Sequence, residues 1–372
     1  MTQDSALKEL LIKHFWAQRA FVQPEVKIYY GEGTAGAQKL ITDVDTFALV
    51  PRRDLTYARI LSDCRTLKNQ SPSARALWLR GLLVFVDGNS GLILLRAGTT
   101  IERDHRLAAS SVGVQLMNED DFQIYDRAVI YPEGSAKQNV SIDDFRQLLT
   151  LNQRYQGVLP LVEYLYRDSW RERTFGQRMR HTLAALRKVS RELDPGNQAH
   201  LGIVCDAVAN FAVGVAECAA TIFHQYLQPA DKSELADALK ILVWGGSEQY
   251  QFYQTVRDRL VKAKGVAEPE PDLELPHWQD FLQLIRNVLE NPGTTFQVPW
   301  LLRSMALDLV RGTPTLSQTS HQDILLLKFG MLAIDYACRA SCLPPDFSRS
   351  LQAPLVRLQA DFAVSLSSFK PK

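Results

Sequence analysis

Two short apolar runs near the N-terminus each carry an aspartate of the kind that binds a metal ion. Asp45 lies beside the run that ends at Val50, and Asp63 lies at the end of the next run, two residues before Arg65. If the two runs are strands paired as a hairpin, the two carboxylates can approach within a few ångströms of each other. Mg²⁺ commonly takes one or two protein carboxylates and completes its shell with water and substrate phosphate. We therefore predict Asp45 and Asp63 as ligands of Mg²⁺ or Mn²⁺.

Three further residues complete the candidate catalytic set. Side chains alternate along a strand, so Arg65 points to the same face as Asp63 and can stabilise the charge of a phosphodiester transition state. Lys68 is a second cation, placed to swing in from the following turn. Glu9, on a helix expected at the N-terminus, adds a contact to the metal or to its bound water. A solvated helix residue is the alternative for Glu9.

The next helix supplies candidate phosphate contacts. The sequence Ser71-Pro72-Ser73 favours a helix start, because proline is preferred at the first helical position. A helix N-terminus attracts phosphate, and the predicted nucleic-acid contacts are Arg75, Lys68 and Arg80. A solvated surface is the alternative for each of these cations.

The order of elements around these residues predicts an α/β sheet. Strands and helices alternate late in the run, which implies crossover connections. The expected strands cover residues 21–30, 39–50, 56–64, 92–97 and 112–117, with helices near the N-terminus, after Ser71, over 101–111 and after 118.

The two acidic motifs, taken in this order, resemble the PD-(D/E)XK nuclease superfamily, which has the restriction-endonuclease-like fold. Asp45-Thr46-Phe47-Ala48 stands where that family places its first catalytic aspartate, and Asp63-Cys64-Arg65 stands where it places D/E-X-K. The resemblance covers roughly residues 6–125. It implies Mg²⁺-dependent hydrolysis of DNA, often in prokaryotic defence or DNA repair.

Arg65 departs from the family pattern, because the family has lysine at this position. Arginine keeps the positive charge but is planar and does not exchange a proton at working pH. Two interpretations stay open. The chain is either a Mg²⁺-dependent deoxyribonuclease or a degenerate nuclease-fold subunit that binds DNA or a protein partner and assembles a larger complex. A scaffold without nucleic-acid contact is a third.

The remainder of the chain predicts helices only. We expect a restriction-endonuclease-like α/β domain over residues 1–130, a linker over 131–141 and an all-α helical domain over 142–372. The helical domain would select substrate, form a homo-oligomer or bind a protein partner. A basic stretch from Trp170 to Arg191 predicts either a nucleic-acid-facing helix or a solvated surface.

Composition excludes several classes of protein. The 372 residues carry a net charge of +1, with 46% hydrophobic and 22% charged residues, so no global basic field indicates nucleic acid. Five cysteines without CxxC spacing do not predict a zinc site, and their odd number, with no apolar leader, predicts a cytoplasmic protein. Asp206, Asn210 and Glu217 interrupt the apolar run over 201–227, which favours a buried bundle helix over a membrane span.

Overall fold

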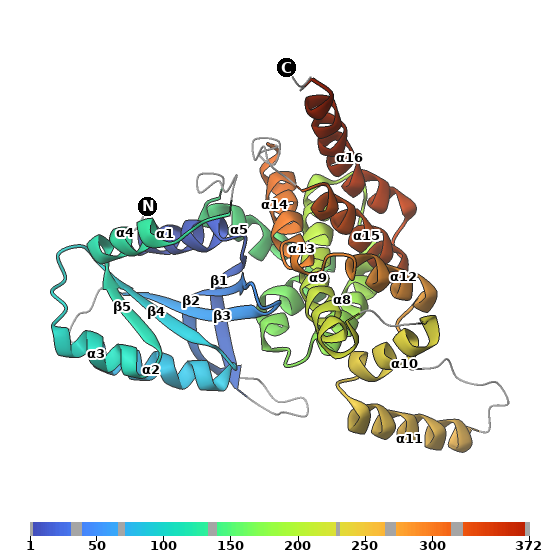
Figure 1. Ribbon diagram of the computed structural model, residues 1–372, viewed down its shortest axis with the longest axis horizontal. Helices are drawn as coiled ribbons and strands as arrows, with labels where there is room; N and C mark the ends of the chain where they lie inside the picture. The colour runs from blue at the N-terminus through green and yellow to red at the C-terminus, as the bar shows by residue number, and fades with distance from the viewer. Residues whose placement is uncertain are drawn as a thin grey trace. The chain divides into compact units, whose positions relative to one another are not determined.

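The computed structural model divides into two compact units (Figure 1). The first comprises Met1–Arg154 with Val310–His321, and the second comprises Tyr155–Leu309 with Gln322–Lys372. The described residues are 3–30, 39–65, 71–132, 140–227, 231–264, 273–313 and 323–368.

The first unit is built around one mixed sheet of five strands in the order β1-β2-β3-β4-β5. β1, β2 and β3 pair antiparallel, whereas β4 joins β3 and β5 joins β4 in parallel. The elements are α1 (Gln3–Ala17), β1 (Phe21–Tyr30), β2 (Lys39–Pro51), β3 (Tyr57–Arg65), α2 (Pro72–Phe85), β4 (Ser90–Leu95), α3 (Arg103–Ser111), β5 (Val114–Asn118), α4 (Glu119–Ala128), α5 (Ile142–Leu149) and α6 (Leu151–Arg154). The predicted mixed α/β arrangement of the N-terminal region is confirmed.

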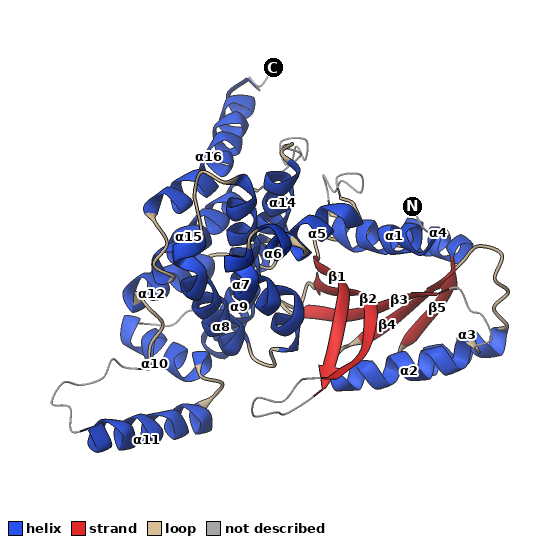
Figure 2. Cartoon of the chain, turned by 180° about the vertical axis from the view of Figure 1, so that it is seen from behind, coloured by secondary structure: helices blue, strands red, loops and turns tan. Residues whose placement is uncertain are grey.

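The helices cover the sheet from both sides. Figure 2 shows α1, α4 and α5 on one side and the crossover helices α2 and α3 on the other. β4 lies inside the sheet, and residues 91–95 are buried, as expected for a continuous apolar strand with helices on both faces. A Cβ at Gly91 would come within 2.8 Å of Leu79 Cδ2, so this glycine lets α2 pack closely over β4.

The division between the units differs from the predicted domain boundary. Residues 142–154 belong to the first unit, although we expected the helical domain to begin at 142. The Phe145 ring meets Trp16 of α1 edge to face at 5.9 Å, and Arg146 pairs with Glu25 of β1 at 2.8 Å. These contacts draw α5 onto the sheet unit, which helical periodicity alone does not reveal. Most of the predicted linker, residues 133–139, lies outside the described residues.

The second unit is helical, as predicted for the C-terminal region. Its longer helices are α8 (Phe175–Val189), α9 (Gln198–Tyr226), α10 (Lys232–Val243), α11 (Ser247–Lys264), α12 (Trp278–Val288), α14 (Val298–Arg311), α15 (Ile324–Ala340) and α16 (Pro345–Ser368). The shorter ones are η2 (Gln156–Val158), α7 (Leu159–Glu163), the π-helical turn η3 (Tyr164–Asp168), η4 (Ser169–Arg171), η5 (Ser190–Glu192) and α13 (Pro292–Thr295).

α9 is the central helix of the second unit. Its length and composition would suffice to cross a membrane, but 94% of its most apolar window is buried among the other helices. Helices α8, α10, α12, α13, α15 and α16 all pack on it. The prediction of a buried bundle helix over this stretch is confirmed.

The acid that interrupts α9 is neutralised inside the unit. Asp206 Oδ1 accepts a hydrogen bond from Arg303 Nε at 2.6 Å, and Oδ2 accepts from Arg303 Nη2 at 3.1 Å and from the Tyr166 hydroxyl at 2.7 Å. Asp206 and Arg303 are both buried. A buried carboxylate needs such partners, because an unpaired charge in the interior is strongly destabilising.

Replacing Arg303 with methionine is expected to destabilise the helical unit by about 3–5 kcal/mol, because Asp206 then stays buried without its counter-ion. The double variant D206L/R303M should recover part of this loss, since it removes the unpaired charge. Urea unfolding followed by circular dichroism measures both. An R303M protein as stable as the wild type would contradict the stabilising role of the pair.

Candidate metal and phosphate site

The ladder between β2 and β3 ends where the predicted acids lie. The last paired residues are Thr46 and Ser62, and Asp45 and Asp63 come directly after them on the two strands. Asp45 Oδ2 accepts a hydrogen bond from the Cys64 amide at 2.6 Å. A side-chain carboxylate therefore takes the place of the next main-chain carbonyl, which explains why the ladder stops here.

Lys8 of α1 neutralises Asp45. Its Nζ lies 2.8 Å from Asp45 Oδ1 and 3.6 Å from Glu25 Oε1 of β1. Burial raises the pKa of Asp45, and the negative charge of Asp63 adds to this, although Lys8 and the Cys64 amide act in the opposite direction. Burial by itself lowers the pKa of Lys8, but the hydrogen bond and charge of Asp45 outweigh it, so that pKa lies above its ordinary value.

Arg75 of α2 holds Asp63 in a two-pronged ion pair. Arg75 Nη2 donates to Asp63 Oδ1 at 2.7 Å, and Nε donates to Oδ2 at 2.8 Å. Asp63 is 0% exposed. The Arg75 guanidinium also stacks on Trp78, with 3.4 Å between its central carbon and the ring centroid. Bidentate arginine–carboxylate pairs are the strong and geometrically specific kind.

Arg65 contacts the same acids only loosely. Its Nε lies 3.4 Å from Asp63 Oδ1, its Nη2 lies 3.9 Å from Asp43 Oδ1, and its side chain is 40% exposed. Arg65 therefore lies beside Asp63, with its side chain partly exposed to solvent.

The other predicted residues divide into three cases. Glu9 lies beside Lys8 on α1, but its Oε1 pairs with Lys13 at 2.6 Å, and within the described chain no contact joins it to Asp45 or Asp63. Arg80 is exposed on α2. Lys68 lies outside the described residues. Arg75, a predicted phosphate contact, instead forms an ion pair with Asp63.

In this arrangement the two predicted metal ligands are held by cations and an amide of the protein. Both oxygens of Asp63 accept from Arg75, and the oxygens of Asp45 face Lys8 and the Cys64 amide. A metal ligand needs an oxygen lone pair directed at the ion. Among the described residues, no group of three or more histidine, cysteine, aspartate or glutamate side chains is placed to hold a metal.

Sequence reasoning missed Lys8 and Glu25. The signal for Lys8 was its place after Leu7 and one turn before Leu11 and Ile12, on a side of the first helix that packs against the sheet, where a lysine needs a partner. Glu25 interrupts β1: Pro24 pairs with Thr46 and Val26 pairs with Val44, while Glu25 has a φ of 53° and no register partner. From this position Glu25 contacts Lys8 and Arg146, and a charged residue in a largely apolar strand was the only hint in the sequence.

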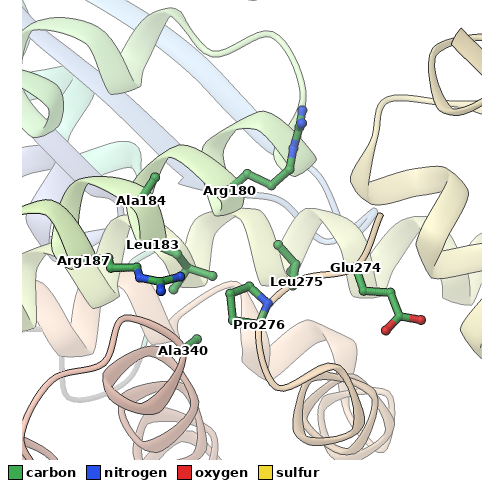
Figure 3. Close-up of a pocket in the computed structure, with 8 residues that line it drawn as sticks. All are labelled: Arg180, Leu183, Ala184, Arg187, Glu274, Leu275, Pro276 and Ala340. Atoms are coloured by element: carbon green, nitrogen blue, oxygen red, sulfur yellow. The ribbon is translucent and has the colours of Figure 1, made fainter. Parts of the chain in front are cut away.

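The basic stretch of the helical unit does not form one continuous surface. Arg178 is buried and donates to Asn210 at 2.8 Å, and Arg180 stacks on Trp244 with 3.9 Å to the ring centroid. Arg180 and Arg187 line a hollow of about 190 Å³ (Figure 3), and the Arg180 side chain extends away from Arg187. Ligand pockets commonly measure about 300–1,000 Å³, so this hollow is too small for a typical ligand.

Comparison with protein-family models, curated proteins and solved structures gave no significant match. Function is therefore argued from the geometry of the two units alone.

Replacing Lys8 with methionine is expected to raise the pKa of Asp45 further, because the hydrogen bond and charge that oppose burial are lost. Carboxyl ¹³C NMR titration measures the shift. Since a raised folded-state pKa favours the protonated acid, the stability of K8M relative to wild type should fall as the pH rises through that pKa. Lys13→Met, which removes a cation paired with Glu9 instead, is the matched control and should leave the Asp45 titration unchanged.

Proposed function

We propose that this chain is a DNA-binding subunit whose N-terminal unit has a restriction-endonuclease-like fold and does not hydrolyse DNA. The observation that carries the proposal is the closed state of Asp63, which is fully buried and held through both oxygens by Arg75. The same unit neutralises Asp45 with Lys8. Carboxylates that would bind a metal in a nuclease instead stabilise the fold here.

The topology of the sheet supports the fold assignment. Three antiparallel strands, a crossover helix and a parallel fourth strand follow a first helix, which is the order that the resemblance implies. The two motif acids lie at the end of the second strand pairing, where that fold would place its catalytic carboxylates.

The energetics of buried ion pairs favour the arrangement in which Arg75 holds Asp63 and Lys8 holds Asp45. Removing one partner from a buried, hydrogen-bonded ion pair costs about 3–5 kcal/mol, because the other charge is left without compensation. A metal ion would have to displace Arg75 from Asp63 and Lys8 from Asp45 together. Arg65, which replaces the lysine of the family motif, cannot exchange a proton with the attacking water.

Two exposed arginines are the proposed phosphate contacts. Arg65 makes only the long contacts described above, and Arg80 forms no ion pair within the described part of the chain. Phosphate contacts of this kind give affinity and orientation without base specificity. We place the subunit in the cytoplasm on its cysteine content, and in a prokaryotic defence or DNA-repair assembly on the resemblance alone.

Mg²⁺-dependent DNA hydrolysis is the second candidate. One observation favours it: Lys8 holds its charge beside Asp45, where a cation would stabilise a scissile phosphate if the acids turned toward a metal. Asp45 and Asp63 are also close enough for their charges to interact.

Wild-type protein is expected not to nick supercoiled plasmid in Mg²⁺ or Mn²⁺ and to show no heat of Mg²⁺ binding by calorimetry. R65K should also be inactive, because restoring the motif lysine leaves Asp63 held by Arg75. Gel electrophoresis of the plasmid measures cleavage. Metal-dependent nicking by the wild type that D45N and D63N both abolish would replace this proposal with the hydrolase, provided that both variants keep the wild-type circular dichroism spectrum.

Binding to a DNA duplex is expected to weaken steeply with salt. R65A and R80A should each reduce the slope of log affinity against log salt by about one, because each loses one phosphate contact. Fluorescence anisotropy of a labelled duplex measures the slopes. Arg349→Ala, which removes an exposed arginine of α16, is the control and should not change them. Absent or salt-insensitive binding would overturn the DNA assignment and leave a protein partner.

A further inference from the structure

A buried histidine lies in the first turn of α9, the central helix of the second unit. His200 is 5% exposed, and its Nδ1 accepts a hydrogen bond from the main-chain amide of Asp194 at 3.0 Å. A ring nitrogen that accepts from an N–H group carries no proton, so the neutral ring has its proton on Nε2. Nε2 is buried and has no hydrogen-bond partner among the described residues. The bond from Asp194 therefore selects one neutral form of the ring.

The turn that joins η5 to α9 begins at Asp194. Its carboxylate Oδ1 accepts from the Gly196 amide at 2.8 Å, and its main-chain carbonyl accepts from the Asn197 amide at 3.1 Å. Asn197 Oδ1 in turn caps α9 by accepting from the Ala199 amide at 2.9 Å. His200 thus joins the first residue of this turn to the helix that the turn caps.

Tyr155 is held by the same group of residues. Its ring meets the His200 ring edge to face with 4.4 Å between centroids, and its hydroxyl accepts from Asn197 Nδ2 at 2.9 Å. Tyr155 is the first residue of the second unit. The start of α9 and the segment by which the chain enters this unit are therefore connected through His200 and Asn197.

A proton on Nδ1 is incompatible with this arrangement. Two N–H groups would face each other where the Asp194 amide now donates to the ring. The protonated ring would also be a buried cation whose Nε2–H group has no acceptor among the described residues. It would lie at the N-terminal end of α9, where the helix dipole disfavours positive charge.

The charged groups around the ring do not compensate for this. Burial lowers the pKa of His200, and the charge of Asp194 opposes burial without outweighing it. α9 carries no charged residue between its start and Asp206, and α13, which packs on α9, has no ionisable residue. Tyr155 is a phenol and stays neutral at acid pH. The exposed charged residues at the end of α8 and in η5 are Arg187, Lys188, Arg191 and Glu192.

We propose that His200 is an acid-sensitive latch at the start of the second unit. In its neutral form it holds the main-chain amide of Asp194. When Nδ1 takes a proton from solvent, the amide is released, the turn that begins at Asp194 opens, and α9 loses the cap that Asn197 provides. The inference goes beyond the proposed function and concerns the helical unit alone.

The direction of the pH effect follows from proton linkage. The ordinary pKa of histidine is about 6.5, and His200 in the closed latch has a lower one. As the pH falls through about 6.5, the open form takes up a proton that the closed form does not. The opening equilibrium then rises by up to about tenfold per pH unit, until the pH reaches the lower pKa of the closed form.

Hydrogen–deuterium exchange of the full chain, measured by mass spectrometry on the peptide that covers residues 193–201, tests the latch. The reference is His200→Asn, whose side chain keeps a neutral acceptor near the position of Nδ1 but does not ionise. The ratio of the wild-type to the H200N exchange rate at one pH cancels the pH dependence of the chemical exchange step. This ratio should rise by about threefold to tenfold from pH 6.5 to pH 5 and stay constant above pH 7.5.

His224 provides the matched control, because it is an exposed histidine on the same helix. The H224N protein should show the same rise in exchange as the wild type. A second measurement uses only the wild-type fold: nitrogen-15 NMR of the histidine rings, with the His200 signals identified by their loss in H200N. At pH 7.5 Nδ1 should have the shift of an unprotonated nitrogen, and the ring should titrate below about 6.5.

Three outcomes would overturn the inference. A His200 ring that carries its proton on Nδ1 at pH 7.5 contradicts the hydrogen bond on which the latch depends. A ring that titrates at or above the ordinary histidine pKa removes the cost of protonation. An exchange ratio that stays constant from pH 7.5 to pH 5 shows that protonation does not open the turn. None of these results bears on DNA binding, which the anisotropy assay measures separately.

Discussion

The buried ion pair between Asp63 and Arg75 holds the N-terminal unit together at its crossover. It joins the end of β3 to the first turns of α2, and the stacking of Arg75 on Trp78 fixes the direction of the guanidinium. Because α2 also packs closely over β4 at Gly91, the pair helps to set the parallel half of the sheet against its antiparallel half. A charge buried to this degree needs its partner, so the pair constrains both elements at once.

A second ion pair joins a helix to the sheet on the sheet's other side. Lys8 ties α1 to Asp45 at the point where the β2–β3 ladder stops, and Glu25 extends the contact to Arg146 of α5. Acidic side chains that could have formed a metal site are thus distributed among separate cations on helices from both faces. This distribution is the physical ground for favouring binding over hydrolysis.

The helical unit follows a different principle. α9 is buried along nearly its whole length, and its single buried acid is paired with Arg303 and Tyr166. The unit therefore has a self-contained core around α9.

The sequence by itself determined the order of elements, the buried character of β4 and α9, and the acids at the ends of two strands. These features are local: they depend on periodicity, on apolar runs and on the alternation of side chains. The pairing of the acids was decided only by the tertiary structure. Lys8 and Arg75 lie on helices whose position depends on packing against the sheet, so the sequence shows the cations without showing which acid each one meets. The same holds for α5, whose aromatic contact with α1 assigns it to the first unit. A side chain's partner depends on the position of a distant backbone, whereas its own secondary structure depends mainly on its neighbours.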